Sequence, residues 1–204
     1  MGPSFVGLLR TSGPRFLRDT FGAPVLFYLG FKLHGLVLGV ALASAWSLLA
    51  YTWERRHGRP GVAAQIGLGI AIVQAVVGLA SQSAIGYFAP PIAANAVYGL
   101  AFLVSVVVGR PLAGVFAREL YPVSDERRRV PGVQRAFVRI SLVWGVYLLA
   151  RSALRLVVLL NFSIDVYVAA NVATAAPVTM ALMAWSFWYG ERAVRYASRE
   201  GAIP

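Results

Sequence analysis

The sequence predicts an all-α fold, a polytopic transmembrane helix bundle with six spans in three hairpins and both termini in the cytoplasm. Hydrophobic residues make up 58% of the 204 positions and only 13% are charged, about half the charged share of a soluble domain. The mean hydropathy is +0.67, and the apolar residues form long blocks separated by short basic segments. This pattern is typical of an integral membrane protein.

The apolar blocks predict six spans, because a helix needs about 20 mostly apolar residues to cross the hydrocarbon core. Residues 24–53 could form one long helix, but the sequence FKLHG places a cation, a histidine and a glycine where a tight turn would lie. We therefore expect two helices there, within a single membrane domain over residues 1–204. The predicted spans are residues 16–31, 35–53, 62–80, 89–109, 137–160 and 165–189.

Basic residues between the apolar blocks predict the orientation. All but three of the 19 Lys and Arg residues lie in the N-terminal segment, the WERRHGRP loop, the 110–139 segment or the ERAVRYASRE tail. Loops rich in Lys and Arg stay on the cytoplasmic side, so an even number of spans with both termini inside is expected. The net charge of +11 is then explained by topology, and the expected partner is the lipid bilayer rather than nucleic acid.

The longest polar segment, residues 110–136, is expected in the cytoplasm. It begins RPLAGVFARELYP, in which Leu112, Val115, Phe116 and Leu120 fall on one helical face. A short helix over 111–121 could rest on the inner membrane surface. An ordinary helix within a loop explains the same pattern equally well.

Small and amide residues inside the spans predict close helix packing. Gly35 and Gly39 form a GxxxG pattern, and intramembrane amides are expected to make interhelical hydrogen bonds. PPIAANAV and VYVAANVAT both contain AAN, with Asn95 and Asn171 at matching places. The match indicates either three repeated hairpins or a coincidence between two Ala-rich helices.

Arg151 and Arg155 lie inside the fifth predicted span, in LLARSALRLVVLLNFSIDVY. Four residues apart, they share one helix face. An arginine in the middle of a span costs about 2.5–3.5 kcal/mol on insertion scales, so both should face the bundle interior or water. One interpretation is an anion, lipid-headgroup or proton-coupled site. The other is a structural ion pair for Arg151 and an Arg155 that reaches the outer interface.

Asp165 is the nearest acidic residue in sequence to these arginines. It follows the turn-prone NFS at the start of the sixth span. Its carboxylate could therefore be the N-cap of that helix, or it could pair with Arg155. The two roles do not exclude each other.

Two further charged groups are candidate sites. Arg18 and Asp19 lie near the inner end of the first span, before Pro24, which should kink the helix and free a carbonyl. This arrangement predicts either a ligand site or a simple interfacial ion pair. Lys32 and His34 lie at the outer end of the same hairpin, as a pH sensor or as ordinary interfacial side chains.

Catalysis and metal binding have little support in the sequence. There is no cysteine, and the two histidines, His34 and His57, are predicted on opposite sides of the membrane. No Walker A loop, GxGxxG, HExxH, GxSxG or SxxK pattern occurs. We therefore expect no enzyme activity, no metal site and no cofactor.

Three stretches resemble the bacterial intracellular septation protein A family: FLRDTFGAPVLFYLGFKLHG, VVVGRPLAGVFARELYP and RAFVRISLVWGVYLL. The resemblance covers most of the chain and implies a protein of the bacterial inner membrane, associated with envelope maintenance and division-linked cell-wall synthesis. Arg151 and Arg155 depart from the family, which has small or amide residues there. The matching residues are Asp19, Pro24 and Lys32 in the first stretch, Arg110, Pro111, Leu112, Glu119 and Leu120 in the second, and Trp144 in the third.

Two functions follow as expectations. The first is an envelope or septation protein that acts by binding lipid or other envelope and division membrane proteins. The second is a small transporter or channel whose polar path passes Arg151, Arg155 and Asp165. Because six short spans enclose little volume, the second function also predicts a homo-oligomer.

Overall fold

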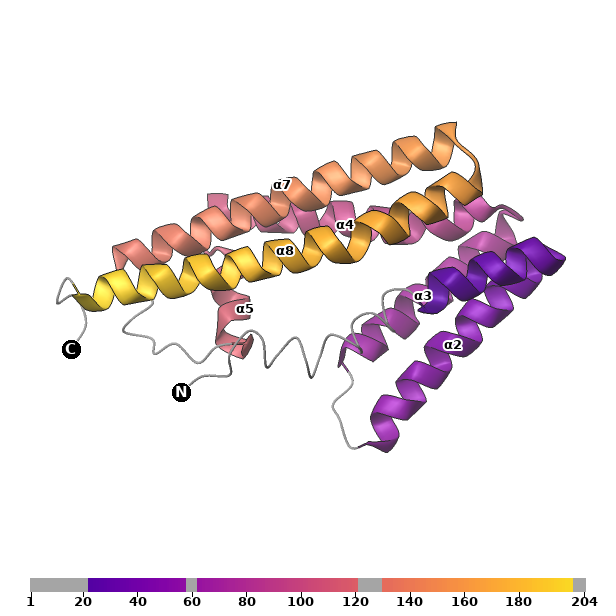
Figure 1. Cartoon of the computed structure of the whole chain (residues 1–204), viewed down its shortest axis with the longest axis horizontal. Coiled ribbons are helices and arrows are strands. Elements are labelled where there is room, and N and C mark those ends of the chain that lie inside the picture. Colours follow the sequence, from indigo (N-terminus) through magenta and orange to yellow (C-terminus); the bar gives the residue numbers. More distant parts are fainter. Residues whose placement is uncertain (1–21, 58–61, 121–129, 200–204) are drawn as a thin grey trace. The chain divides into compact units, whose positions relative to one another are not determined.

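The computed structural model describes residues 22–57, 62–120 and 130–199 of the chain. Within these ranges 92% of the residues are helical and none is in a strand, which confirms the all-α prediction. A first helix covers residues 22–34. The labelled helices in Figure 1 are α2 (Leu36–Arg56), α3 (Val62–Ala80), α4 (Ala84–Val107), α5 (Leu112–Leu120), α7 (Pro131–Asn161) and α8 (Ile164–Arg199).

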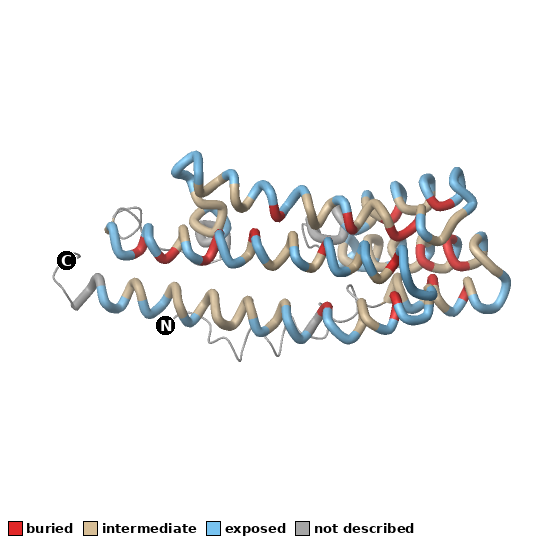
Figure 2. The backbone as a smooth tube through the Cα atoms, turned by 90° about the horizontal axis from the view of Figure 1, so that it is seen from above, coloured by how far each residue is buried: buried red, intermediate tan, exposed pale blue. Residues whose placement is uncertain are grey.

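Four of the described helices are long and apolar enough to cross a membrane. They are α2, α4, α7 and the Ile164–Tyr196 part of α8, and a shorter apolar stretch covers Gly67–Ala80. Figure 2 shows few buried positions along these helices, and large apolar side chains such as Leu49 and Val76 are exposed. Apolar surface turned outward is suited to lipid rather than to water.

The largest differences between the observed helices and the predicted spans lie at three helix ends. α4 begins at Ala84, before the predicted span 89–109, since Pro90 and Pro91 lie within the helix rather than at its start. α7 begins at Pro131, a favourable residue for a first helical position. α8 continues past residue 189 to Arg199. In each case the helix extends beyond the apolar block from which the span was predicted.

The chain divides into two compact units. The described residues up to Ala93, together with Leu154–Pro177, form the first unit. Ala94–Ala153 and the described residues from Val178 onward form the second.

In the first unit, helix 22–34 and α2 form a tight hairpin. Gly35 separates them with a φ of +78°, a backbone conformation that glycine adopts without strain, so the prediction of two helices instead of one is confirmed. Gly39 faces Gly30 across the hairpin: a Cβ at Gly30 would lie 2.8 Å from the Gly39 backbone, and one at Gly39 would lie 2.8 Å from the Phe27 carbonyl. The predicted Gly39 contact is therefore made with Gly30, while Gly35 serves the turn.

In the first unit, Pro91 of α4 leaves one backbone carbonyl of its own helix without a hydrogen-bond donor. Pro91 has no N–H, so the carbonyl of Tyr87, four residues earlier, has no donor within the helix. Gln74 of α3 donates its Nε2 to that carbonyl at 3.2 Å. The amide therefore makes the interhelical hydrogen bond expected of a polar residue inside a span.

Replacing Gln74 by leucine should destabilise the α3–α4 contact by about 1 kcal/mol, the size of an interhelical hydrogen bond in a membrane. The loss is measured from unfolding of the purified protein in mixed detergent micelles. Gln65→Leu is the matched control, because Gln65 lies exposed on the same helix. Equal stability of the two variants would contradict the role given to Gln74.

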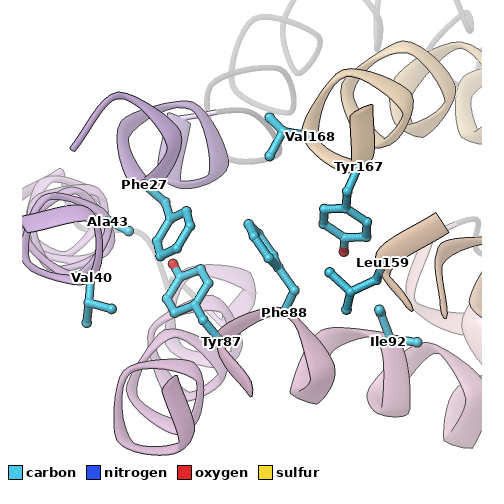
Figure 3. Close-up of a cluster of buried hydrophobic side chains, with 9 residues drawn as sticks. All are labelled: Phe27, Val40, Ala43, Tyr87, Phe88, Ile92, Leu159, Tyr167 and Val168. Atoms are coloured by element: carbon cyan, nitrogen blue, oxygen red, sulfur yellow. The ribbon is translucent and has the colours of Figure 1, made fainter. Parts of the chain in front are cut away.

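Aromatic side chains form the core of the first unit (Figure 3). Phe27 is 0% exposed and stacks on Tyr87 with 3.9 Å between ring centroids. Phe88 packs edge-on against Phe27 at 4.9 Å and lies 4.6 Å from the Tyr167 ring on its other side. The rings join helix 22–34, α4 and the start of α8. The cluster consists of Phe27, Val40, Ala43, Tyr87, Phe88, Ile92, Leu159, Tyr167 and Val168.

In the second unit, α4 and α7 approach closely at a pair of glycines. A Cβ on Gly99 would lie 3.1 Å from the Gly145 carbonyl, and one on Gly145 would lie 3.1 Å from the Gly99 carbonyl. Nearby, the Trp144 indole Nε1 donates to Ser186 Oγ at 3.0 Å, and Arg139 donates to the Tyr189 hydroxyl at 2.7 Å. These bonds tie α7 to α8.

The first turn of α5 is hydrogen-bonded to α4 and to α7. The Leu112 amide donates to Ser105 Oγ of α4, and the Ala113 amide donates to Ser141 Oγ of α7, both at 3.0 Å. These serines satisfy two N–H groups that a helix start leaves without partners. In Figure 1, α5 runs across the direction of α7. The structure thus confirms a helix within the predicted range 111–121.

Replacing Ser141 by alanine should loosen α5, because Ser141 is fully buried and no water would replace its hydroxyl at the Ala113 amide. We expect a loss of about 1 kcal/mol and faster hydrogen exchange at the first amides of α5. Ser47→Ala is the control, since Ser47 bonds only within its own helix. If exchange in α5 is the same in both variants, Ser141 does not hold the helix.

Candidate functional site

Lys32 and Asp165 form an ion pair in the first unit. Lys32 Nζ lies 2.8 Å from Asp165 Oδ2, and both side chains are about half exposed, at 50% and 48%. Asp165 is therefore the partner of Lys32, whereas the sequence suggested Arg155.

Asp165 is not the N-cap of α8. The helix begins at Ile164, and Ser163 lies before it, with its Oγ 3.4 Å from the Val166 amide. Asp165 lies instead in the first turn of α8, where the helix dipole favours a negative charge. The capping prediction was wrong because NFS contains the serine that takes the N-cap position.

The guanidinium of Arg155 is hydrogen-bonded to the hydroxyl group of Tyr167. Its Nε and Nη2 donate to the Tyr167 hydroxyl at 3.2 and 2.6 Å, and the guanidinium carbon lies 5.6 Å from the centroid of the same ring. Tyr167 is 1% exposed and belongs to the aromatic core. Arg155 thus packs against the core of the first unit.

Arg151 belongs to the second unit and is held by two hydroxyl groups. Its Nη1 donates to the Tyr147 hydroxyl at 3.1 Å and to Thr179 Oγ1 at 3.3 Å. These two oxygens are themselves 2.9 Å apart. The Nε of Arg151 is buried and has no hydrogen-bond partner within the described residues. The predicted ion pair of Arg151 is not formed there.

The partners of both arginines were missed from the sequence. Tyr147 precedes Arg151 by one helical turn, so the i, i+4 spacing could have indicated it. Tyr167 and Thr179 come from α8, and no local pattern connects them with α7. Aromatic and hydroxyl residues are common in such helices, so neither stood out.

The remaining candidates are not brought together. Arg18 and Asp19 lie outside the described residues. His34 is exposed at the end of helix 22–34, Asn95 belongs to the second unit, and Asn171, in the first, has a buried Oδ1 with no hydrogen-bond partner in the described part of the chain. Within the described ranges, no group of three or more His, Asp or Glu residues is placed to hold a metal ion.

Long apolar helices, outward apolar side chains and arginines bonded inside the helical units define a multi-pass helical membrane protein. The family model described as "Protein of unknown function (DUF3159)" matches residues 12–197. The chain belongs to this family.

No curated protein and no solved structure matches the chain. Nothing in the comparisons supports the resemblance to the septation protein A family. The stretches that suggested it are short and rich in apolar residues, which unrelated membrane helices share.

Proposed function

We propose that the protein acts in the bacterial inner membrane, in envelope maintenance or septation, through contact of its cytoplasmic face with the lipid surface. In this proposal six helices cross the bilayer and both termini are cytoplasmic. The predicted first span, of which the structure describes the part in helix 22–34, and α3 add to the four long apolar helices, and the even number agrees with the basic segments at both ends of the chain.

The observation that carries the proposal is the attachment of α5. Ser105, near the end of α4, and Ser141 of α7 fix its first turn, while Val115 and Phe116 are each 46% exposed. Exposed apolar groups on a helix that runs across the membrane-crossing direction are suited to the boundary between headgroups and acyl chains. The exposed Arg110 at the start of this segment adds attraction to anionic lipids.

The first test is topology, for which the absence of cysteine gives a clean background. Single cysteines at His57 and Gly109 should react with a membrane-impermeant maleimide only from the cytoplasmic side. A cysteine at His34 should react only from the outer side. Labelling of positions 34 and 57 from the same side would rule out the proposed topology.

The second test concerns the role in the envelope. Deletion of the gene should change cell length or envelope permeability, and the wild-type chain should restore both. Phe116→Glu should fail to restore them while still reaching the membrane, whereas Gln134→Glu, at an exposed position outside α5, should succeed. A deletion strain with normal division and permeability would refute the proposal.

The second candidate function is a small transporter or channel, favoured by the position of Arg151 within an apolar helix, where no carboxylate of the described residues pairs with it. Reconstituted wild-type protein should then carry anion flux in liposomes, and Arg151→Gln should abolish it. If liposomes that contain the wild-type protein show no anion flux under any imposed gradient, the transport function is ruled out.

A further inference from the structure

Arg151 carries more hydrogen-bond donors than its surroundings use. A guanidinium has five N–H groups and stays charged. Only Nη1 is engaged, with the neutral oxygens of Tyr147 and Thr179, and the buried Nε has no partner in the described residues. The edge formed by Nε and Nη2 therefore has donors to offer.

The charge of Arg151 is not balanced nearby. In the described residues of the second unit, the ion pair formed is Arg195 with Glu191, on α8. Among the described residues, the hydrogen bonds of Arg151 go to hydroxyl groups. An arginine charge in an apolar span and a buried donor without an acceptor both cost free energy. An anion that accepts from Nε and Nη2 would offset both costs.

The donor geometry selects the class of anion. Nε and Nη2 lie in one plane and form the fork that binds two oxygens of a carboxylate, phosphate or sulfate. The hydroxyl groups of Tyr147 and Thr179, which lie 2.9 Å apart, both accept from Nη1 and hold the guanidinium in place from the side away from this fork. We propose that Arg151, Tyr147 and Thr179 form a binding site for a small oxyanion.

The depth of Arg151 in the membrane decides whether the ligand is a free oxyanion or a lipid headgroup. Along α7, Arg151 lies roughly 18 Å beyond Arg139, at about 1.5 Å per residue. With Arg139 at the inner interface, that places Arg151 near the middle of a hydrocarbon core about 30 Å thick, below the level of headgroup phosphates. The proposed ligand is therefore a free oxyanion. The inference rests on neither proposed function, because an anion that binds without crossing satisfies it.

The test is equilibrium binding of sulfate, phosphate and acetate to the full chain in nanodiscs of neutral phosphatidylcholine. The wild-type protein should show saturable binding of at least one of the three, and Arg151→Gln should show none. Arg139→Gln is the matched control, since it removes one exposed arginine from the same helix and should bind as the wild type does. Arg151→Lys keeps the charge but not the fork, and should bind about tenfold more weakly.

Three results would overturn the inference. One is the absence of saturable binding by the wild type with all three probes, and another is wild-type affinity in Arg151→Gln. If Arg151→Gln does not fold, wild-type affinity in both Arg151→Lys and Tyr147→Phe has the same meaning. The third is occupancy seen only in nanodiscs that contain phosphatidylglycerol, because the site would then hold a headgroup phosphate instead of a free oxyanion.

Discussion

Gly39→Leu is expected to prevent helix 22–34 from packing on α2 and to leave little folded protein. A Cβ at this position would lie 2.8 Å from the Phe27 carbonyl and 3.1 Å from the Phe31 amide nitrogen, both backbone atoms. Backbone cannot move aside as a flexible side chain can, so the cost should reach about 3 kcal/mol, the upper end for overpacking. Separation of the helices would also disturb the stacking of Phe27 on Tyr87.

The measurement is the yield of monodisperse protein in mild detergent and its unfolding midpoint. Gly69→Leu is the matched control, because a Cβ at Gly69 meets nothing within 4 Å. Helix propensity changes equally in the two variants, so their difference reports the close approach alone. Similar yields and midpoints for the two variants would show that the hairpin does not depend on the contact between Gly30 and Gly39.

Tyr167→Phe is expected to cost about 2–3 kcal/mol, because it removes the acceptor of two hydrogen bonds from a charged group in an apolar setting. Arg155 would keep its charge and lose the oxygen to which Nε and Nη2 donate. The ring would remain, so the packing against Phe88 should change little. Unfolding in mixed micelles measures the loss.

A double variant separates the hydrogen bonds from the packing. Arg155→Leu combined with Tyr167→Phe removes the donor and the acceptor together, so the pair should be less destabilised than Tyr167→Phe alone. If the two losses instead add, the interaction between Arg155 and Tyr167 contributes nothing to stability.

The helical architecture could be predicted because it depends on local properties of the sequence. Long apolar blocks indicated the helices, and FKLHG indicated the break that the structure places at Gly35. The apolar face of RPLAGVFARELYP indicated α5. Helix ends were less predictable, since Pro90 and Pro91 are tolerated where Gln74 supplies a donor to the Tyr87 carbonyl. Because that donor comes from another helix, the sequence around the prolines does not indicate it.

The candidate site was predictable only in part. An arginine inside an apolar span is visible in the sequence, and the need for a polar partner follows from its cost. The choice of partner depends on which side chains of α8 meet α7 or helix 22–34. Asp165 is the nearest acidic residue in sequence to Arg155, but in the folded protein it forms an ion pair with Lys32. Distance along the chain does not measure distance in space.

The hydroxyl partners of Arg151 and Arg155 have a consequence for electrostatics. Within the described residues, the hydrogen bonds of these two arginines go to phenol and alcohol oxygens, which carry no formal charge. Each arginine is then a fixed positive charge in a medium of low dielectric constant, where its field is weakly screened. Such charges repel metal cations and attract anions.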